Sequence, residues 1–268
     1  MKIISFNANS IRMRIHQLEA LIQTYQPDVI GIQETKVSDP DFPVQEIEAL
    51  GYHATFHGQK THYGVATLTR EKPVAVQKGF EDEPEDAQRR MVMVDLPYKG
   101  STIKIINGYF PQGENRDHPE KFPNKTRFYE NLQSFLENSC KPDQPIVVLG
   151  DFNISPEDTD IGIGPDNAKR WLKTGKCSFL PEEREWYQKL LNWGLTDTYR
   201  HLYPTAAEHF SWFDYRSRGF ERDPKRGLRI DHILVTATLL MNCTGAGVDY
   251  DVRGMDKPSD HAPVWAQL

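Results

Sequence analysis

Apolar runs and amphipathic stretches alternate along the whole chain. Short runs rich in Val and Ile predict buried strands at 2–7, 29–34, 145–150 and 228–235. Apolar residues at spacings of three and four predict helices at 11–25, 43–50, 121–138 and from Pro181 to Gly194. The pattern therefore contains both periods, with strands and helices mixed along one chain.

The middle of the chain consists of strand signals separated by turn signals. These strands are predicted at 52–57, 63–69, 73–78, 90–96 and 102–109. A short aromatic strand is predicted at 210–215, a final strand at 262–268, and a loop-rich stretch at 154–180. Strands in direct succession indicate antiparallel sheet, and the order predicts an α+β fold with two packed sheets and helices outside.

Composition narrows the class of protein. The 268 residues are 38% hydrophobic and 26% charged, which is enough for one large core or two smaller ones. No apolar run approaches the ~20 residues of a membrane helix, and the N-terminal run is too short for a signal peptide. Three cysteines, odd in number and far apart, favour a reduced, cytoplasmic protein. The net charge of −6 argues against a protein that coats nucleic acid non-specifically, but not against a nucleic-acid enzyme.

Polar side chains stand at the ends of several predicted strands. They are Asn7, Glu34, Tyr109, Asp151, Asn153, Asp231, Asp260 and His261. Each has an ordinary explanation when taken alone, such as an Asx turn at Asp151 or a turn cap at Asp260. Together they form a set of hard oxygen donors that favours Mg²⁺ or Mn²⁺ over Zn²⁺. A metal that neutralises phosphoryl charge, beside a histidine, suits hydrolysis of a phosphate ester.

Several motifs carry a resemblance to a known family. They occupy residues 4–7, 31–36, 107–113, 150–154, 175–184, 210–216, 229–231 and 259–263. The sequence resembles the exonuclease III group of the endonuclease/exonuclease/phosphatase superfamily over essentially its full length, which implies a single domain of residues 1–268. The resemblance implies a four-layered αββα sandwich and a divalent-metal phosphodiesterase with Mg²⁺, for which Mn²⁺ would substitute. The implied substrate is double-stranded DNA with 3′ ends or abasic sites, cut by 3′→5′ exonuclease, AP endonuclease and 3′-end-cleaning activities.

The same resemblance implies a role for each residue. Metal or scissile phosphate would be surrounded by Asn7, Glu34, Asp151, Asn153, Asp260 and His261, with Glu34 as the main ligand. Catalysis would fall to Tyr109, Asp151, Asn153, Asp231 and His261, and the identity of the general base stays open. One departure is Ser10, in Asn7-Ala8-Asn9-Ser10, where the family often has glycine. If that position needs a positive φ, serine costs more than glycine.

DNA is favoured over other phosphate esters by the surroundings of these motifs. The predicted DNA-contact residues are Arg90, Gln112, Lys176, Trp212, Phe213, Arg216 and Leu228. By strand alternation only one of Trp212 and Phe213 can face a cleft. Two alternatives remain: a phosphatase of soluble or lipid phosphates, and a non-catalytic DNA-binding module on the same fold. A monomer is the default expectation, with no membrane association.

Overall fold

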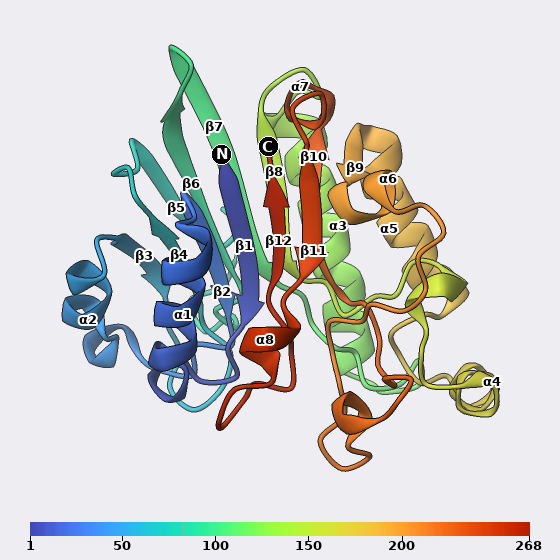
Figure 1. Ribbon diagram of the computed structural model, residues 1–268. Coiled ribbons are helices and arrows are strands. Elements are labelled where there is room, and N and C mark those ends of the chain that lie inside the picture. The colour runs from blue at the N-terminus through green and yellow to red at the C-terminus, as the bar shows by residue number, and fades with distance from the viewer. Residues whose placement is uncertain (82) are drawn as a thin grey trace.

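Two six-stranded sheets pack face to face, with helices on their outer faces (Figure 1). The computed structural model describes residues 1–81 and 83–268. Strands from both sheets contribute to the central core, which contains Ile3, Val94, Ile105, Val147 and Ile233. This arrangement confirms the predicted α+β class and the two-sheet sandwich with outer helices.

Both sheets are mainly antiparallel. The first has the order β11 (Gly245–Val248), β12 (Val264–Gln267), β1 (Lys2–Asn7), β2 (Val29–Gln33), β4 (Val65–Thr69) and β3 (His53–His57). The second has the order β5 (Ala75–Lys78), β6 (Met91–Tyr98), β7 (Ser101–Tyr109), β8 (Ile146–Asp151), β10 (Asp231–Thr236) and β9 (Leu195–Asp197). Each sheet has one parallel pair, β1 with β2 and β7 with β8. The parallel strands of each pair therefore end at the same edge.

The helices bury the outer face of each sheet. Helices α1 (Ile15–Tyr25) and α2 (Val44–Ala49) cover the first sheet, and their apolar side chains share a core with Ile4, Ile30 and Leu68. Helices α3 (Lys121–Ser139) and α5 (Pro181–Trp193) cover the second sheet. Shorter helices are α6 (Thr198–Leu202), α7 (Ala237–Leu240) and α8 (Tyr250–Arg253). Among the described residues, no helix is long and apolar enough to cross a membrane.

Two predicted elements are wrong. The stretch 154–180 was expected to be loop but contains α4 (Pro165–Thr174), which starts with a proline after Gly164 and ends at Gly175 in a left-handed conformation. None of its side chains is fully buried; its few apolar residues share one face, where Ala168 and Trp171 pack against the core that contains Phe179. The segment 210–215 forms no strand, because Trp212 makes only isolated bridges to Leu228 and His261. The start of the predicted helix at 11–25 is a 3₁₀ turn, Ile11–Met13.

Candidate active site

The strand ends of both sheets converge at one edge of the sandwich. In the second sheet Asp151 is the register partner of Tyr109 on one side and of Asp231 on the other. In the first sheet β1 ends at Asn7 beside the end of β2, so Glu34 follows directly. The packing of the two sheets brings these ends into contact, because the Asn7 Nδ2 donates to Glu34 Oε1 at 2.8 Å and to Asp151 Oδ2 at 2.9 Å.

A compact group of ligand atoms forms at this edge. One donor atom each from Glu34, Asp151 and His261 lies within 4.8 Å of the others. The two carboxylates offer the hard oxygen donors that fit a divalent cation, and the imidazole borders the same space. The structure therefore brings together Glu34, Asp151 and His261 of the predicted set, and Asn7 contacts the two carboxylates.

Asn7 lies differently from the prediction. Its Oδ1 accepts the backbone N–H of Asn9 at 3.0 Å, and its amide nitrogen faces the two carboxylates. An amide nitrogen cannot ligate a cation, since it has no free lone pair. Asn7 thus spaces Glu34 and Asp151 instead of presenting its oxygen as a ligand.

His261 is held between two buried aspartates. Its Nδ1 lies 2.8 Å from Asp231 Oδ2, and its Nε2 lies 3.7 Å from Asp151 Oδ2. Burial lowers the pKa of His261, but the charges of Asp231 and Asp151 outweigh it and raise the pKa to about 10. Burial also raises the pKa of Asp151 to about 7. The site therefore pairs a cationic imidazole with a carboxyl group that titrates near neutrality.

Asp260 lies outside the compact group and is fixed by other side chains. Its two oxygens accept from Asn9 Nδ2 at 2.8 Å and from Trp212 Nε1 at 3.1 Å. Burial favours the neutral form, yet His261 and these two hydrogen bonds keep the pKa of Asp260 below its ordinary value. Asp260 is thus an anion beside the group of Glu34, Asp151 and His261.

Two residues at the site were missed by the sequence reasoning. Lys36 Nζ lies 2.9 Å from Glu34 Oε2 and donates to Asn9 Oδ1 at 2.5 Å. Lys36 lies two positions after Glu34, and Asn9 lies two positions after Asn7. This closeness to a predicted ligand was the available signal. Together they connect Glu34 to Asp260 across the site.

Asn153 and Tyr109 complete the edge. Asn153 adopts a φ of +53°, and its Nδ2 donates to the carbonyl of Phe110 at 3.0 Å. Burial, then the charge of Glu34, raise the pKa of Tyr109 well above its ordinary value, so the phenol stays neutral. Both residues lie where the sequence placed them, at the ends of β8 and β7.

Arg90 lies between two aromatic rings. Its guanidinium is 4.2 Å from the ring centre of Tyr63 and 4.6 Å from that of Tyr109. It also donates to the Tyr109 carbonyl at 3.0 Å. These contacts hold Tyr109 in place. Arg90 is 8% exposed, which leaves a small part of its surface accessible to an anion. Tyr63 was also missed by the sequence reasoning.

The other predicted DNA-contact residues divide into two groups. Lys176, Trp212 and Arg216 line a cavity of about 430 Å³ that also contains Arg170, Arg222 and Arg226. Gln112 is exposed on the loop after β7. Phe213 and Leu228 are 0% and 1% exposed and pack in small apolar cores, so neither reaches the surface that a DNA contact requires. The expected alternation holds in one respect: Trp212 is partly exposed and Phe213 is not.

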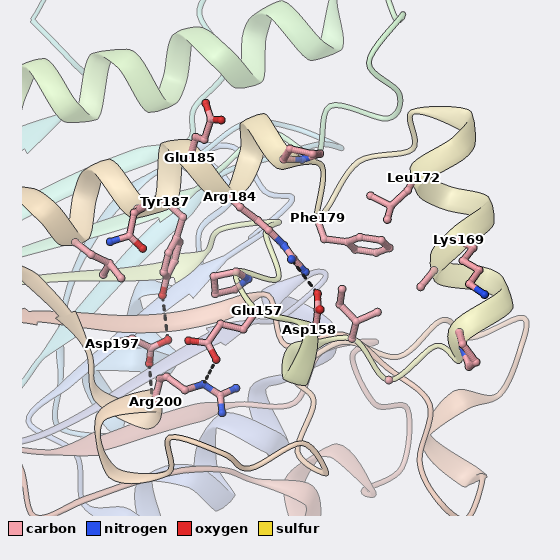
Figure 2. Close-up of a pocket in the computed structure, with 18 of the residues that line it drawn as sticks. Glu157, Asp158, Lys169, Leu172, Phe179, Arg184, Glu185, Tyr187, Asp197 and Arg200 are labelled. Carbon is pink, nitrogen blue, oxygen red and sulfur yellow. Dashed lines mark hydrogen bonds and ion pairs between the residues drawn. The ribbon is translucent and has the colours of Figure 1, made fainter.

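A larger cavity, of about 950 Å³, lies between α4 and α5 (Figure 2). Phe179 and Leu172 project into it, and an ion pair of 2.9 Å joins Arg184 to Asp158 at its rim. None of the predicted site residues lines it. Size alone therefore does not locate the chemistry of this protein.

The sandwich and its carboxylate site define a class of protein, the metal-assisted phosphoesterases built on two packed sheets. The model of the endonuclease/exonuclease/phosphatase family matches residues 4–261, and the chain belongs to this family, whose nucleases depend on divalent metals. It is 58% identical to exodeoxyribonuclease III of Haemophilus influenzae over 268 residues, which is 100% of both chains.

Solved structures agree with this assignment. The 3′ phosphatase NExo from Neisseria, bound to a product DNA hairpin, has a TM-score of 0.90 and 37% identity and aligns over 100% of this chain and 99% of its own. An AP endonuclease from Archaeoglobus fulgidus has a TM-score of 0.90 and 35% identity over the same shares. The fold and the family membership thus rest on matches along the full described chain.

Proposed function

We propose that this protein is a DNA-repair phosphodiesterase with 3′→5′ exonuclease activity on double-stranded DNA, AP endonuclease activity and 3′-end-cleaning activity. The observation that carries the proposal is the grouping of Glu34, Asp151 and His261 within 4.8 Å. The full-length relationship to an exodeoxyribonuclease III supports the same reaction. Both point to water attacking a phosphodiester beside a divalent cation.

Mg²⁺ is the proposed cofactor, with Mn²⁺ as a substitute. Glu34 would be the main ligand, Asp151 and His261 border the same space, and Asp260 adds negative charge beside it. When bound, the cation neutralises charge on the phosphoryl oxygens. Asn7 sets the separation of the two carboxylates by donating to both.

The proposed catalytic roles follow from the hydrogen bonds of each group. Asp151 orients the attacking water and accepts its proton, which suits a carboxyl group with a pKa of about 7. Asp231 holds the imidazole of His261, and the cationic ring donates to the phosphate. Asn153 and the neutral phenol of Tyr109 donate to phosphate oxygens.

The DNA backbone would lie across the basic surfaces on either side of this site. Arg90 and Gln112 are proposed on one side, and Lys176 and Arg216 on the other. Trp212, which is tied to Asp260, would contact the sugar next to the scissile phosphate. A single domain, a monomeric state and a cytoplasmic location complete the proposal.

The test is cleavage of a duplex that carries one abasic-site analogue, with Mg²⁺ or with EDTA. We expect incision with Mg²⁺ only, and a loss of about 10²-fold or more in kcat for Glu34→Gln, since a ligand charge is removed. Glu19→Gln, an exposed residue of α1, is the matched control and should retain full activity.

Two outcomes would contradict the proposal. An intact duplex after ample enzyme and metal, with phosphate released from inositol phosphates, would identify a phosphatase instead. Unchanged turnover in Glu34→Gln would show that the measured activity does not come from this site.

A further inference from the structure

The backbone that follows Asp151 is tethered by buried side chains at three successive residues. Each carbonyl of this tripeptide accepts one hydrogen bond, from a different side chain. The bonds are Tyr129 Oη to Phe152 O at 2.7 Å, Lys125 Nζ to Asn153 O at 2.8 Å, and His232 Nε2 to Ile154 O at 2.8 Å. A segment outside the sheets thus has its polar groups satisfied by side chains of α3 and β10.

Lys125 belongs to a fully buried ion pair. Its Nζ lies 2.5 Å from Glu183 Oε1, and both side chains are 0% exposed. The second carboxylate oxygen, Glu183 Oε2, accepts the backbone N–H groups of Ser178 and Leu180 at 2.9 and 2.8 Å. Burying two charges is costly, and apolar residues of similar volume often stabilise a core as well as a buried ion pair does. A role other than stability is therefore the better explanation for the pair.

The tethered segment contains a left-handed residue. Asn153 has a φ of +53°, in a region that asparagine adopts more readily than most residues other than glycine. Phe152 is stacked on Phe110 with ring centres 4.2 Å apart, so the chain is held on both sides of Asn153. The side chain of Asn153 is fixed in turn, because its Nδ2 donates to the Phe110 carbonyl at 3.0 Å.

We propose that Tyr129 and the Lys125–Glu183 pair are positioning residues for Asn153 and act on the reaction through its orientation. The inference rests on the proposed function, in which Asn153 donates to the scissile phosphate. Tyr129 and Lys125 are four residues apart, so they lie on one face of α3. They donate to the adjacent carbonyls of Phe152 and Asn153. A variant that loses these tethers would bind DNA normally but would place Asn153 less accurately at the phosphate.

Tyr129→Phe tests the proposal with a matched control, Tyr52→Phe. Both tyrosines are buried, at 2% and 4% exposure, and each donates its hydroxyl to one backbone carbonyl, that of Phe152 or that of Pro27. We expect similar decreases in the urea midpoint for the two variants. On the abasic duplex only Tyr129→Phe should lose kcat, by about tenfold, with KM within about twofold. Equal kcat in the two variants would overturn the role of Tyr129.

A double-mutant cycle tests the ion pair. Lys125→Met with Glu183→Gln removes both charges together, which avoids leaving one charge buried alone. We expect this double variant to lose kcat by about tenfold in the parent, and to cause no further loss in an Asn153→Ala background. Independent, multiplicative losses would show that the pair does not act through Asn153, and an unchanged kcat in the parent would show that it acts only on stability.

The same assays separate this inference from the proposed function. If Glu34→Gln and Asn153→Ala lower kcat while Tyr129→Phe and the Lys125–Glu183 double variant keep the parent kcat, the positioning role fails and the proposed function stands. If Glu34→Gln keeps full turnover, the proposed function itself fails.

Discussion

Ser10 shows how one residue can carry a local cost near the site. Its φ is +94°, in the region that glycine adopts freely and other residues avoid. The sequence comparison of Asn7-Ala8-Asn9-Ser10 with the family pattern anticipated this problem only conditionally. The positive φ confirms that the position demands the conformation, and serine adopts it at a cost.

Ser10→Gly should therefore stabilise the protein. The backbone strain is worth about 1–3 kcal/mol, and the extra freedom of glycine in the unfolded chain offsets up to about 1 kcal/mol of that. We expect a gain of about 1 kcal/mol, seen as a rise of about 2–4 °C in Tm by calorimetry. Ser101→Gly, at an exposed strand position, is the control and should lower Tm. A lower Tm for Ser10→Gly would contradict the strain argument.

At the scale of elements, β7 and β8 approach each other very closely at one point. Gly150 has a φ of +146°, and a Cβ added there would lie 1.9 Å from the carbonyl oxygen of Gly108. These two glycines are register partners one step before Tyr109 and Asp151. The close approach therefore sets how the two catalytic strand ends lie side by side.

Gly150→Ala should destabilise the protein far more than an ordinary glycine substitution. Gly100→Ala is the control, since Gly100 also has a positive φ, +79°, but no atom lies within 4 Å of its added Cβ. We expect a cost of about 1 kcal/mol for Gly100→Ala and about 3 kcal/mol or more for Gly150→Ala. Urea unfolding of both variants measures the difference. Equal costs would mean that the strands separate easily.

At the scale of the whole molecule, a polar contact joins the two sheets inside an otherwise apolar core. Asn107 of β7 donates to the Ala66 carbonyl of β4 at 2.8 Å and accepts from Gln33 Nε2 of β2 at 2.7 Å. All of these groups are buried. Asn107 lies two residues before Tyr109, and Gln33 lies one residue before Glu34. Their hydrogen bond therefore sets the relative position of the strands that carry Glu34 and Tyr109.

Asn107→Leu should cost about 2–4 kcal/mol in urea unfolding, because buried partners lose their hydrogen bonds. Adding Gln33→Leu should cost less than the sum of the two single changes, because the second change removes an amide that has already lost its bond to Asn107. The interaction energy from this cycle is the measurement. Additive losses would argue against a direct coupling between the sheets.

The sequence by itself determined the elements and the residue types at their ends. Strand and helix periods depend on neighbours two to four positions apart, so β1, β2, β8 and α3 were predicted within a few residues. It also determined the class of site, since acidic and amide side chains followed five separate strands. Helix α4 was missed because it is short and mostly polar, with only a few apolar residues on one face between Gly164 and Gly175.

Only the tertiary structure decided which atoms of those residues meet. Asn7 turns its nitrogen to the carboxylates because the backbone of Asn9 takes its oxygen. Phe213 and Leu228 enter small cores, whereas Trp212 stays at the surface. The orientation and burial of a side chain depend on contacts between segments more than a hundred residues apart, such as that between Asn7 and Asp151. The local pattern of the sequence does not predict such packing.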